Sequence, residues 1–309
     1  MRPASSLAPA VALALALTAG PIRPVLAQDL EPRSYQNAPV GLNFFVAGYT
    51  LSDGAVLFDP SIALENAELE IDGPVVGYAR ILDVAGRSAK LDAAIGDVCL
   101  DGSADFQGQR ASRSVCGVTD AKMRLAVNFI GAPALTAAEF GEYRQDLVVG
   151  ASFLVSAPVG QYDETRLVNI GTNRWAARAE IGMSKIFAQR WQIELALAGN
   201  FFEDNDEFYG GNHRSQEAIW SLQAHLVRGF ASGFWFALDA TQYEGWRTTM
   251  NGVPSNDFQS NSRFGMTLSV PINRRQSLKF GGSSGVSTRT GTDFDLYALA
   301  WQYRWGGGI

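Results

Sequence analysis

The stretch at residues 295–305 constrains the fold most, because its side chains alternate strictly in kind. A period of two is typical of a β-strand, whose successive side chains leave opposite faces. The large apolar residues that share one face are Tyr297, Leu299, Trp301, Tyr303 and Trp305. The opposite face begins with Leu296, continues with two alanines and ends with Gln302 and Arg304. About ten residues with aromatic rings at both ends suit a lipid crossing, so the pattern predicts a transmembrane strand.

Further segments of this kind bring the predicted strands to twelve. They lie near residues 40–50, 74–83, 88–97, 120–130, 146–156, 174–186, 190–202, 217–228, 233–244, 262–270, 277–286 and 294–305. Short connections alternate with longer polar ones at 51–73, 98–119, 157–173, 203–216, 245–261 and 287–293. Bacterial outer-membrane barrels have this arrangement, with short turns in the periplasm and long loops outside. We therefore predict an all-β fold, a closed antiparallel transmembrane β-barrel of about 12 strands, with both termini on the periplasmic side.

If the apolar faces meet lipid, the charged faces meet in the lumen. The residues assigned to that face are Lys90, Lys122, Arg124, Arg178, Arg263, Lys279, Arg304, Asp92, Asp146, Glu180, Glu194, Asp239 and His225. A soluble two-sheet sandwich could not hold this set, because each unpaired buried charge would cost several kcal/mol. A wet or internally paired lumen can hold it.

Seven of these residues are the predicted lining of a solute path: Arg124, Arg178, Glu180, Glu194, His225, Asp239 and Arg263. Twelve strands fall between the filled interior of about eight strands and the aqueous channel of 16 to 18. The lumen is therefore expected to be narrow and crossed by arginine–carboxylate pairs. The alternative for each residue is structural, since such pairs also satisfy one another and hold the barrel in shape.

The first 27 residues predict a secretory signal peptide that is removed. Arg2 gives a positive start, residues 8–19 are apolar, and the small residues 25–27 suit cleavage before Gln28. The alternative is a retained membrane anchor, but the apolar run is too short to span a bilayer. Residues 28–309 then form a single barrel domain, in which no apolar run is long enough for a transmembrane helix.

The formal net charge of −6 becomes more negative once Arg2 and Arg23 leave with the signal peptide. Nucleic-acid binding depends on basic residues that neutralise phosphates, so we expect no nucleic-acid partner.

One short connection departs from the pattern. Residues 131–145 fall where a tight turn is expected, yet residues 134–140 carry alanine, leucine and glutamate in an order that favours a helix. A short helix over the periplasmic mouth and an irregular turn are both compatible with this stretch.

The two cysteines, Cys99 and Cys116, predict a disulfide, because an exported protein carries both in one polar stretch. With only two histidines in the chain, we expect no metal site at these cysteines. The acidic run at residues 203–207 offers oxygen ligands for Ca²⁺ but lacks the spacing of a calcium loop, which favours a solvated loop at 203–216.

The sequence lacks a usable catalytic arrangement, which argues against an enzyme. A serine nucleophile needs a histidine beside it, and His225 falls on the luminal face while a lipid-cleaving site must open toward lipid. The pattern G-x-S-x-G occurs once, at Gly281-Gly282-Ser283-Ser284-Gly285, but it lies inside a predicted strand and not at the strand-to-helix turn that a nucleophile needs. The glycine runs at 281–285 and 306–308 lack the lysine and helix of a phosphate loop, so no cofactor is expected.

Several stretches together resemble one family. They are RLVNIGTNRW at 166–175, VGAS to PVGQY within 149–162, SLQAH at 221–225 and LAWQYRW at 299–305. The chain resembles the putative meta-pathway of phenol degradation family, outer-membrane "transporter" β-barrels, over roughly residues 35 to 305. The resemblance implies an outer-membrane barrel that takes up small, often aromatic, organic compounds. It carries over no binding residues.

The sequence thus predicts an outer-membrane channel or transporter for passive passage of small organic solutes, with membrane lipid and the solute as its partners. The first alternative is a structural or adhesive barrel with a blocked lumen. The others are a membrane-embedded lipid hydrolase and a soluble exported β-protein. The sequence leaves open the solute, the pore radius, the oligomeric state and whether a segment folds inward as a plug.

Overall fold

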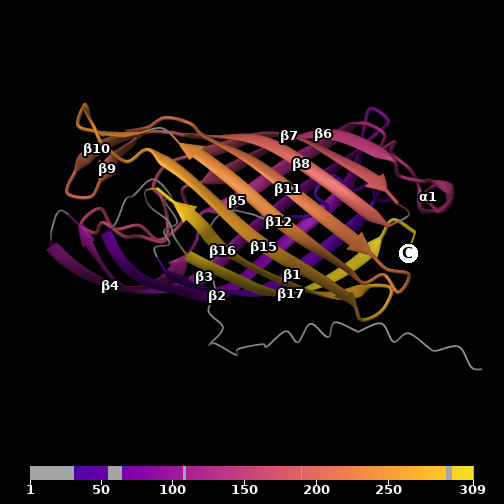
Figure 1. Cartoon of the computed structure of the whole chain (residues 1–309), viewed down its shortest axis with the longest axis horizontal. Coiled ribbons are helices and arrows are strands. Elements are labelled where there is room, and N and C mark those ends of the chain that lie inside the picture. The colour runs from indigo at the N-terminus through magenta and orange to yellow at the C-terminus, as the bar shows by residue number, and fades with distance from the viewer. Residues whose placement is uncertain are drawn as a thin grey trace, which may run out of the picture.

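The computed structural model describes residues 31–54, 65–106, 109–188, 190–245, 247–289 and 294–308. Within them, twelve antiparallel strands form a ring (Figure 1). These are β1 (Leu42–Gly54), β2 (Glu65–Val84), β3 (Arg87–Phe106), β5 (Ala121–Ile130), β6 (Leu147–Ala157), β7 (Ala176–Phe187), β8 (Trp191–Phe202), β11 (Ile219–Gly229), β12 (Trp235–Gly245), β15 (Gln259–Pro271), β16 (Gln276–Thr288) and β17 (Phe294–Gly306). The first strand β1 pairs with the last strand β17 along its whole length, so the sheet closes on itself. The predicted all-β closed barrel is confirmed, whereas the predicted signal peptide lies outside the described residues.

The barrel wall has an apolar outer face and a polar inner face. On β15, Phe264 and Met266 have exposed fractions of 54% and 64%, whereas Arg263 beside them has 3%. On the neighbouring β12, Asp239 is 1% exposed. In water, exposed apolar side chains outside and buried charged side chains inside would be unfavourable. A strand with lipid on one side and a polar lumen on the other requires this arrangement. No helix in the described part of the chain is long and apolar enough to cross a membrane.

The short turns and the long loops lie at opposite ends of the barrel (Figure 1). We name them the turn end, where the chain also finishes, and the loop end. At the turn end, α1 (Ala137–Glu142) occupies the exceptional connection, so of the two possibilities that the sequence left open the short helix is present. Its capping box fixes where it begins: Thr136 accepts a hydrogen bond from the Glu139 N–H, and the Glu139 carboxylate accepts one from the Thr136 N–H at 2.8 Å.

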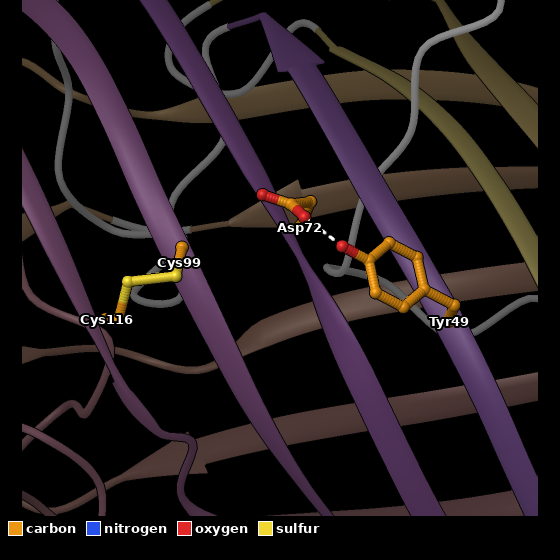
Figure 2. Close-up of a disulfide and its surroundings, with 4 residues drawn as sticks. All are labelled: Tyr49, Asp72, Cys99 and Cys116. Carbon is orange, nitrogen blue, oxygen red and sulfur yellow. Dashed lines mark hydrogen bonds between the residues drawn. A yellow bond between two sulfur atoms is a disulfide. The ribbon is translucent and has the colours of Figure 1, made fainter.

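Several segments predicted as polar loops contain strands. Within residues 98–119, β4 (Gln109–Val118) pairs with an extension of β3 beyond the barrel wall, and we call this pair the β3–β4 hairpin. Cys99 and Cys116 lie directly opposite each other in this hairpin and form a disulfide, as predicted (Figure 2). On the adjacent strands, the Tyr49 hydroxyl donates a hydrogen bond to the Asp72 carboxylate. The prediction of a loop at residues 98–119 was wrong. The disulfide and the hydrogen bonds between β3 and β4 stabilise strands there, although the sequence is polar and glycine-rich.

A second sheet lies at the loop end and is made of four short strands. They are β9 (Asn205–Phe208), β10 (Asn212–Gln216), β13 (Thr248–Met250) and β14 (Val253–Pro254). An apolar cluster joins the loop-end elements. Its buried members are Leu69, Ile71, Val98, Leu100, Val168, Ile170, Phe208 and Phe294. Burial of these side chains packs the connection around residues 168–170 and Phe208 against β2, β3 and β17.

Candidate functional site

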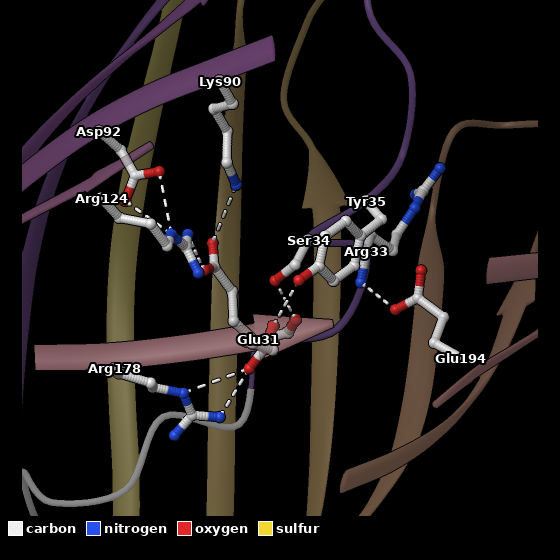
Figure 3. Close-up of polar contacts among 10 residues, drawn as sticks. Glu31, Arg33, Ser34, Tyr35, Lys90, Asp92, Arg124, Arg178 and Glu194 are labelled. Atoms are coloured by element: carbon white, nitrogen blue, oxygen red, sulfur yellow. Dashed lines mark hydrogen bonds and ion pairs between the residues drawn. The ribbon is translucent and has the colours of Figure 1, made fainter. Parts of the chain in front are cut away.

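The N-terminal residues 31–37, which we call the luminal segment, lie inside the barrel (Figure 3). The chain turns from this segment into β1 at the turn end, where the Gly41 N–H donates to the Ile81 carbonyl at 2.9 Å. Just before that, the Asn37 N–H donates to the Gln145 side chain at 3.0 Å. Tyr35, in the middle of the segment, is 3% exposed. The segment is therefore enclosed by the barrel wall.

The Glu31 carboxylate fixes the start of the luminal segment inside the barrel, and we call its contacts the outer anchor. It meets Arg124 Nη2 at 2.5 Å and Lys90 Nζ at 3.8 Å. Arg124 also holds Asp92 through Nε at 3.1 Å, so one guanidinium joins a wall carboxylate to the segment's carboxylate (Figure 3). The Ser34 hydroxyl donates to the Glu31 carbonyl at 2.7 Å and stabilises the bend that brings Glu31 to these cations.

Charge near Glu31 determines its ionisation. Enclosure in the barrel would raise the pKa of Glu31, but the cations Arg124, Lys90 and Lys279 offset this and hold its pKa well below the usual range. The Glu31 side chain remains 41% exposed to the space around it. It is therefore an ionised carboxylate that water or a solute can still reach.

The inner anchor is Tyr35. Its hydroxyl donates to Glu180 Oε1 at 2.8 Å, while Glu180 Oε2 pairs with Arg178 at 2.7 Å. The ring lies against the wall where two strands carry glycine. A Cβ at Gly150 or Gly182 would be 2.6 Å or 2.2 Å from ring atoms of Tyr35, closer than real Cβ contacts. These two glycines therefore form the flat surface that accepts the ring.

A third contact lies between the two anchors. The Arg33 N–H donates to Glu194 Oε2 at 2.5 Å. The Arg33 guanidinium lies over the Trp235 ring, 5.1 Å from its centroid. The luminal segment thus spans the lumen from β3 and β5 on one side to β8 and β12 on the other.

Behind Glu194, polar residues bond to one another in two groups, one on β8 and one across β11, β12 and β15. Gln192 donates to Glu194 at 2.6 Å. His225 Nδ1 lies 2.7 Å from Asp239 Oδ1, and Asp239 Oδ2 accepts from the Thr267 hydroxyl at 2.9 Å. His225 and Asp239 have side chains only 4% and 1% exposed. Their bonds satisfy charges that the barrel wall and the luminal segment enclose.

Two cavities lie on either side of Glu31. The loop-side cavity has a volume of about 370 Å³ and extends from Arg124 toward Ile170 below the loop-end cluster. The turn-side cavity has a volume of about 490 Å³ and reaches Arg275 among the turns. The residues that line both are Glu31, Val46, Ala79 and Lys90. The Glu31–Lys90 contact therefore lies at the boundary between the two spaces.

The seven residues predicted to line a path take different places. Arg124 lines the loop-side cavity. The pairs Arg178–Glu180 and His225–Asp239, with Glu194, bond to each other or to the luminal segment. Arg263 is buried and donates to the Ser283 hydroxyl at 3.0 Å, with its guanidinium 3.6 Å from the centroid of the Phe294 ring.

The sequence reading missed Glu31, Arg33 and Tyr35. The run Glu31-Pro32-Arg33-Ser34-Tyr35 was the available signal, because charges and an aromatic ring directly after the predicted cleavage site are unusual in a plain leader to the first strand. Their luminal partners could not be identified without the tertiary structure.

The acidic run at 203–207 folds into the second sheet. Asp206 Oδ1 lies 2.6 Å from His213 Nδ1, and Asp204 lies 3.6 Å from the other ring nitrogen. Across the described residues, no group of three or more histidine, cysteine, aspartate or glutamate side chains is placed to hold a metal ion.

Comparison with known proteins identifies the family. The chain matches the family described as "Putative MetA-pathway of phenol degradation" over residues 66–303. The chain belongs to this family. The resemblance that the sequence motifs indicated is thereby confirmed. A comparison with curated protein sequences found no match.

Solved structures support the same fold. The COG4313 outer membrane channel from Pseudomonas putida F1 superposes with a TM-score of 0.68 at 18% identity, covering 90% of this chain and 100% of that chain. The transport unit of the autotransporter AIDA-I from Escherichia coli gives 0.50 at 10% identity, covering 90% and 93%. The first is an outer membrane channel by its title, and at these identities both likenesses concern the fold alone.

Proposed function

We propose that this member of the family is an outer-membrane channel for the passive passage of small organic solutes, in which the luminal segment narrows the path. The observation that carries the proposal is the pair of cavities in line inside a closed barrel, with Glu31 and Lys90 at their common boundary. A structural barrel with a filled interior would not need two such spaces. Outer-membrane lipid surrounds the apolar wall, and the turn end faces the periplasm.

The family description and the fold both favour this function over an enzyme. The lipid-hydrolase alternative needs a histidine and a nucleophile that open toward lipid. His225 is buried on the inner face and its Nδ1 is engaged by Asp239 at 2.7 Å. We propose that this pair supports the barrel wall and the luminal segment rather than a reaction. Phospholipid hydrolysis by the purified protein that is lost in His225→Ala would contradict this assignment.

The test is conductance in planar lipid bilayers together with solute flux into liposomes. We expect narrow channels from the full-length protein and a larger conductance after deletion of residues 31–37. The adhesive alternative, with a lumen that stays blocked, predicts no conductance in either protein. Flux of a small neutral polar solute such as arabinose into liposomes that carry either form, above the flux into protein-free liposomes, would support passive passage.

A further inference from the structure

The loop-side cavity has two kinds of wall. Apolar side chains form one part: Val46, Val75, Ala79, Leu154 and Ile170. Cations form another part: Lys90 and Arg124 next to the luminal segment, and Lys122 nearer the loop end. A volume of about 370 Å³ is at the small end of the range for ligand pockets, about 300 to 1,000 Å³. The cavity is therefore suited to a small solute with an apolar body and one charged or polar group.

Lys122 is the cation without a partner. It lies two residues from Arg124 on β5, so both side chains point to the inside of the barrel. Its side chain is exposed, and it makes no ion pair or hydrogen bond with any residue that the structure describes. Asp120, the carboxylate at the same end of the strand, already accepts from the Gly160 N–H at 2.9 Å and from the Thr172 hydroxyl at 2.7 Å. Lys122 thus offers a free ammonium to whatever enters the cavity from the loop end.

The balance of charge in this cavity depends on Glu31. With Glu31 in place, the carboxylates Glu31, Asp92 and Asp120 match the cations Lys90, Lys122 and Arg124. Without it, the wall has one positive charge too many. Because the luminal segment supplies Glu31, the charge that completes the cavity does not belong to a strand of the wall.

From these observations we propose that the loop-side cavity is a binding site for small carboxylates with an apolar body, such as aromatic acids, and that the solute carboxylate replaces Glu31 on Arg124 and Lys90. This inference rests on the proposed channel function. Lys122 attracts the anion. The planar guanidinium of Arg124 then donates hydrogen bonds to the solute carboxylate in the geometry in which Arg124 now binds Glu31. One carboxylate leaves as another arrives, so the number of ion pairs is conserved. Glu31 lines both cavities, so its departure opens the boundary toward the turn end.

The experiment compares benzoate with benzyl alcohol, which share a ring and differ in charge. Binding of each to the detergent-solubilised full-length protein is measured by calorimetry. Benzoate should bind at least about tenfold more tightly than benzyl alcohol, the factor expected for one charge-assisted hydrogen bond. Lys122→Met should weaken that preference, because Arg124 and Lys90 remain while one attracting charge is lost, and Lys122→Arg should keep it.

The matched control is Lys185→Met. Lys185 also projects from a barrel strand, but it pairs with Asp146 at 2.6 Å and is not among the residues lining either cavity. It should leave benzoate affinity unchanged. Glu31→Gln should tighten benzoate binding, because the competing carboxylate is gone.

Two results would overturn the inference: equal affinity for the two solutes in the unmodified protein, or benzoate binding that Lys122→Met leaves intact. Flux into liposomes separates this from a failure of the channel function. If arabinose enters liposomes with the protein faster than protein-free liposomes but benzoate has no preference in binding, the carboxylate site is wrong and the channel stands. If the protein does not raise arabinose entry, the channel function itself is wrong.

Discussion

At the scale of single residues, Tyr35 is the contact most easily tested. Tyr35→Phe removes one hydroxyl that donates to Glu180. A hydrogen bond to a charged group contributes about 1.5–3 kcal/mol, so the docked state of the luminal segment should lose at least about tenfold in population. In single-channel recordings this appears as more frequent or longer openings.

Tyr49→Phe is the matched control for this prediction. It also removes a hydroxyl that donates to a carboxylate, that of Asp72, but on the outer face of the wall. The frequency and length of channel openings in Tyr49→Phe should equal those of the unmodified protein. Openings that increase in both variants would mean that the change reflects a weakened barrel and not an undocked segment.

The glycine surface under Tyr35 gives a second prediction. Gly182→Ala places a Cβ 2.2 Å from the Tyr35 ring. The ring must therefore move away from the wall, which undocks the luminal segment, and conductance should rise. Gly281→Ala is the control, since a Cβ at Gly281 has no neighbour within 4 Å. Unchanged conductance in Gly182→Ala would show that the ring's seat does not hold the segment in place.

At the scale of elements, the β3–β4 hairpin depends on its disulfide. The two cysteines are 17 residues apart, and closing a loop of this length stabilises by about 3 kcal/mol in the chain-entropy model. The double variant Cys99→Ser, Cys116→Ser should therefore be cleaved faster by protease in the hairpin, while the barrel itself stays folded. Limited proteolysis with mass spectrometry measures both.

The double variant Ser103→Ala, Ser112→Ala is its control. These residues also lie directly opposite each other in the same hairpin, without a covalent bond. Cleavage should remain as in the unmodified protein. Equal protection in the cysteine variant would indicate that the apolar cluster, and not the disulfide, holds the hairpin.

At the scale of the whole molecule, acid should open the channel through Glu31. The pKa of Glu31 is held below its usual range by Arg124, Lys90 and Lys279 despite its enclosure. A depressed pKa means that the ionised carboxylate stabilises the docked segment fully above the ordinary glutamate pKa of about 4.3. That stabilisation is lost as pH falls through the lowered value, so conductance should rise only in that acidic range.

Recordings of Glu31→Gln across the same pH range check the assignment. The variant has no carboxylate to titrate, so its conductance should be raised at neutral pH and lack the acidic step. An acidic step of the same size in the variant would assign the titration to another group.

Much of this architecture could be predicted from the chain alone. Alternation in the stretches around Leu197 and Phe264 identified the outward faces, because a lipid-facing wall repeats one local rule every second residue. The helix at residues 137–142 and the cysteine pair were also readable, since both depend on neighbours close in sequence. The β3–β4 hairpin was not, because its polar, glycine-rich strands gain their order from cross-strand and disulfide bonds.

What the sequence by itself determined is the wall: a closed barrel with apolar residues outside and charges inside. Only the tertiary structure decided what fills it. The luminal segment's bonds join residues 93, 145 and 161 positions apart, from Glu31 to Arg124, Tyr35 to Glu180 and Arg33 to Glu194. No local pattern encodes such partners, because they meet only when the ring of strands closes around the segment.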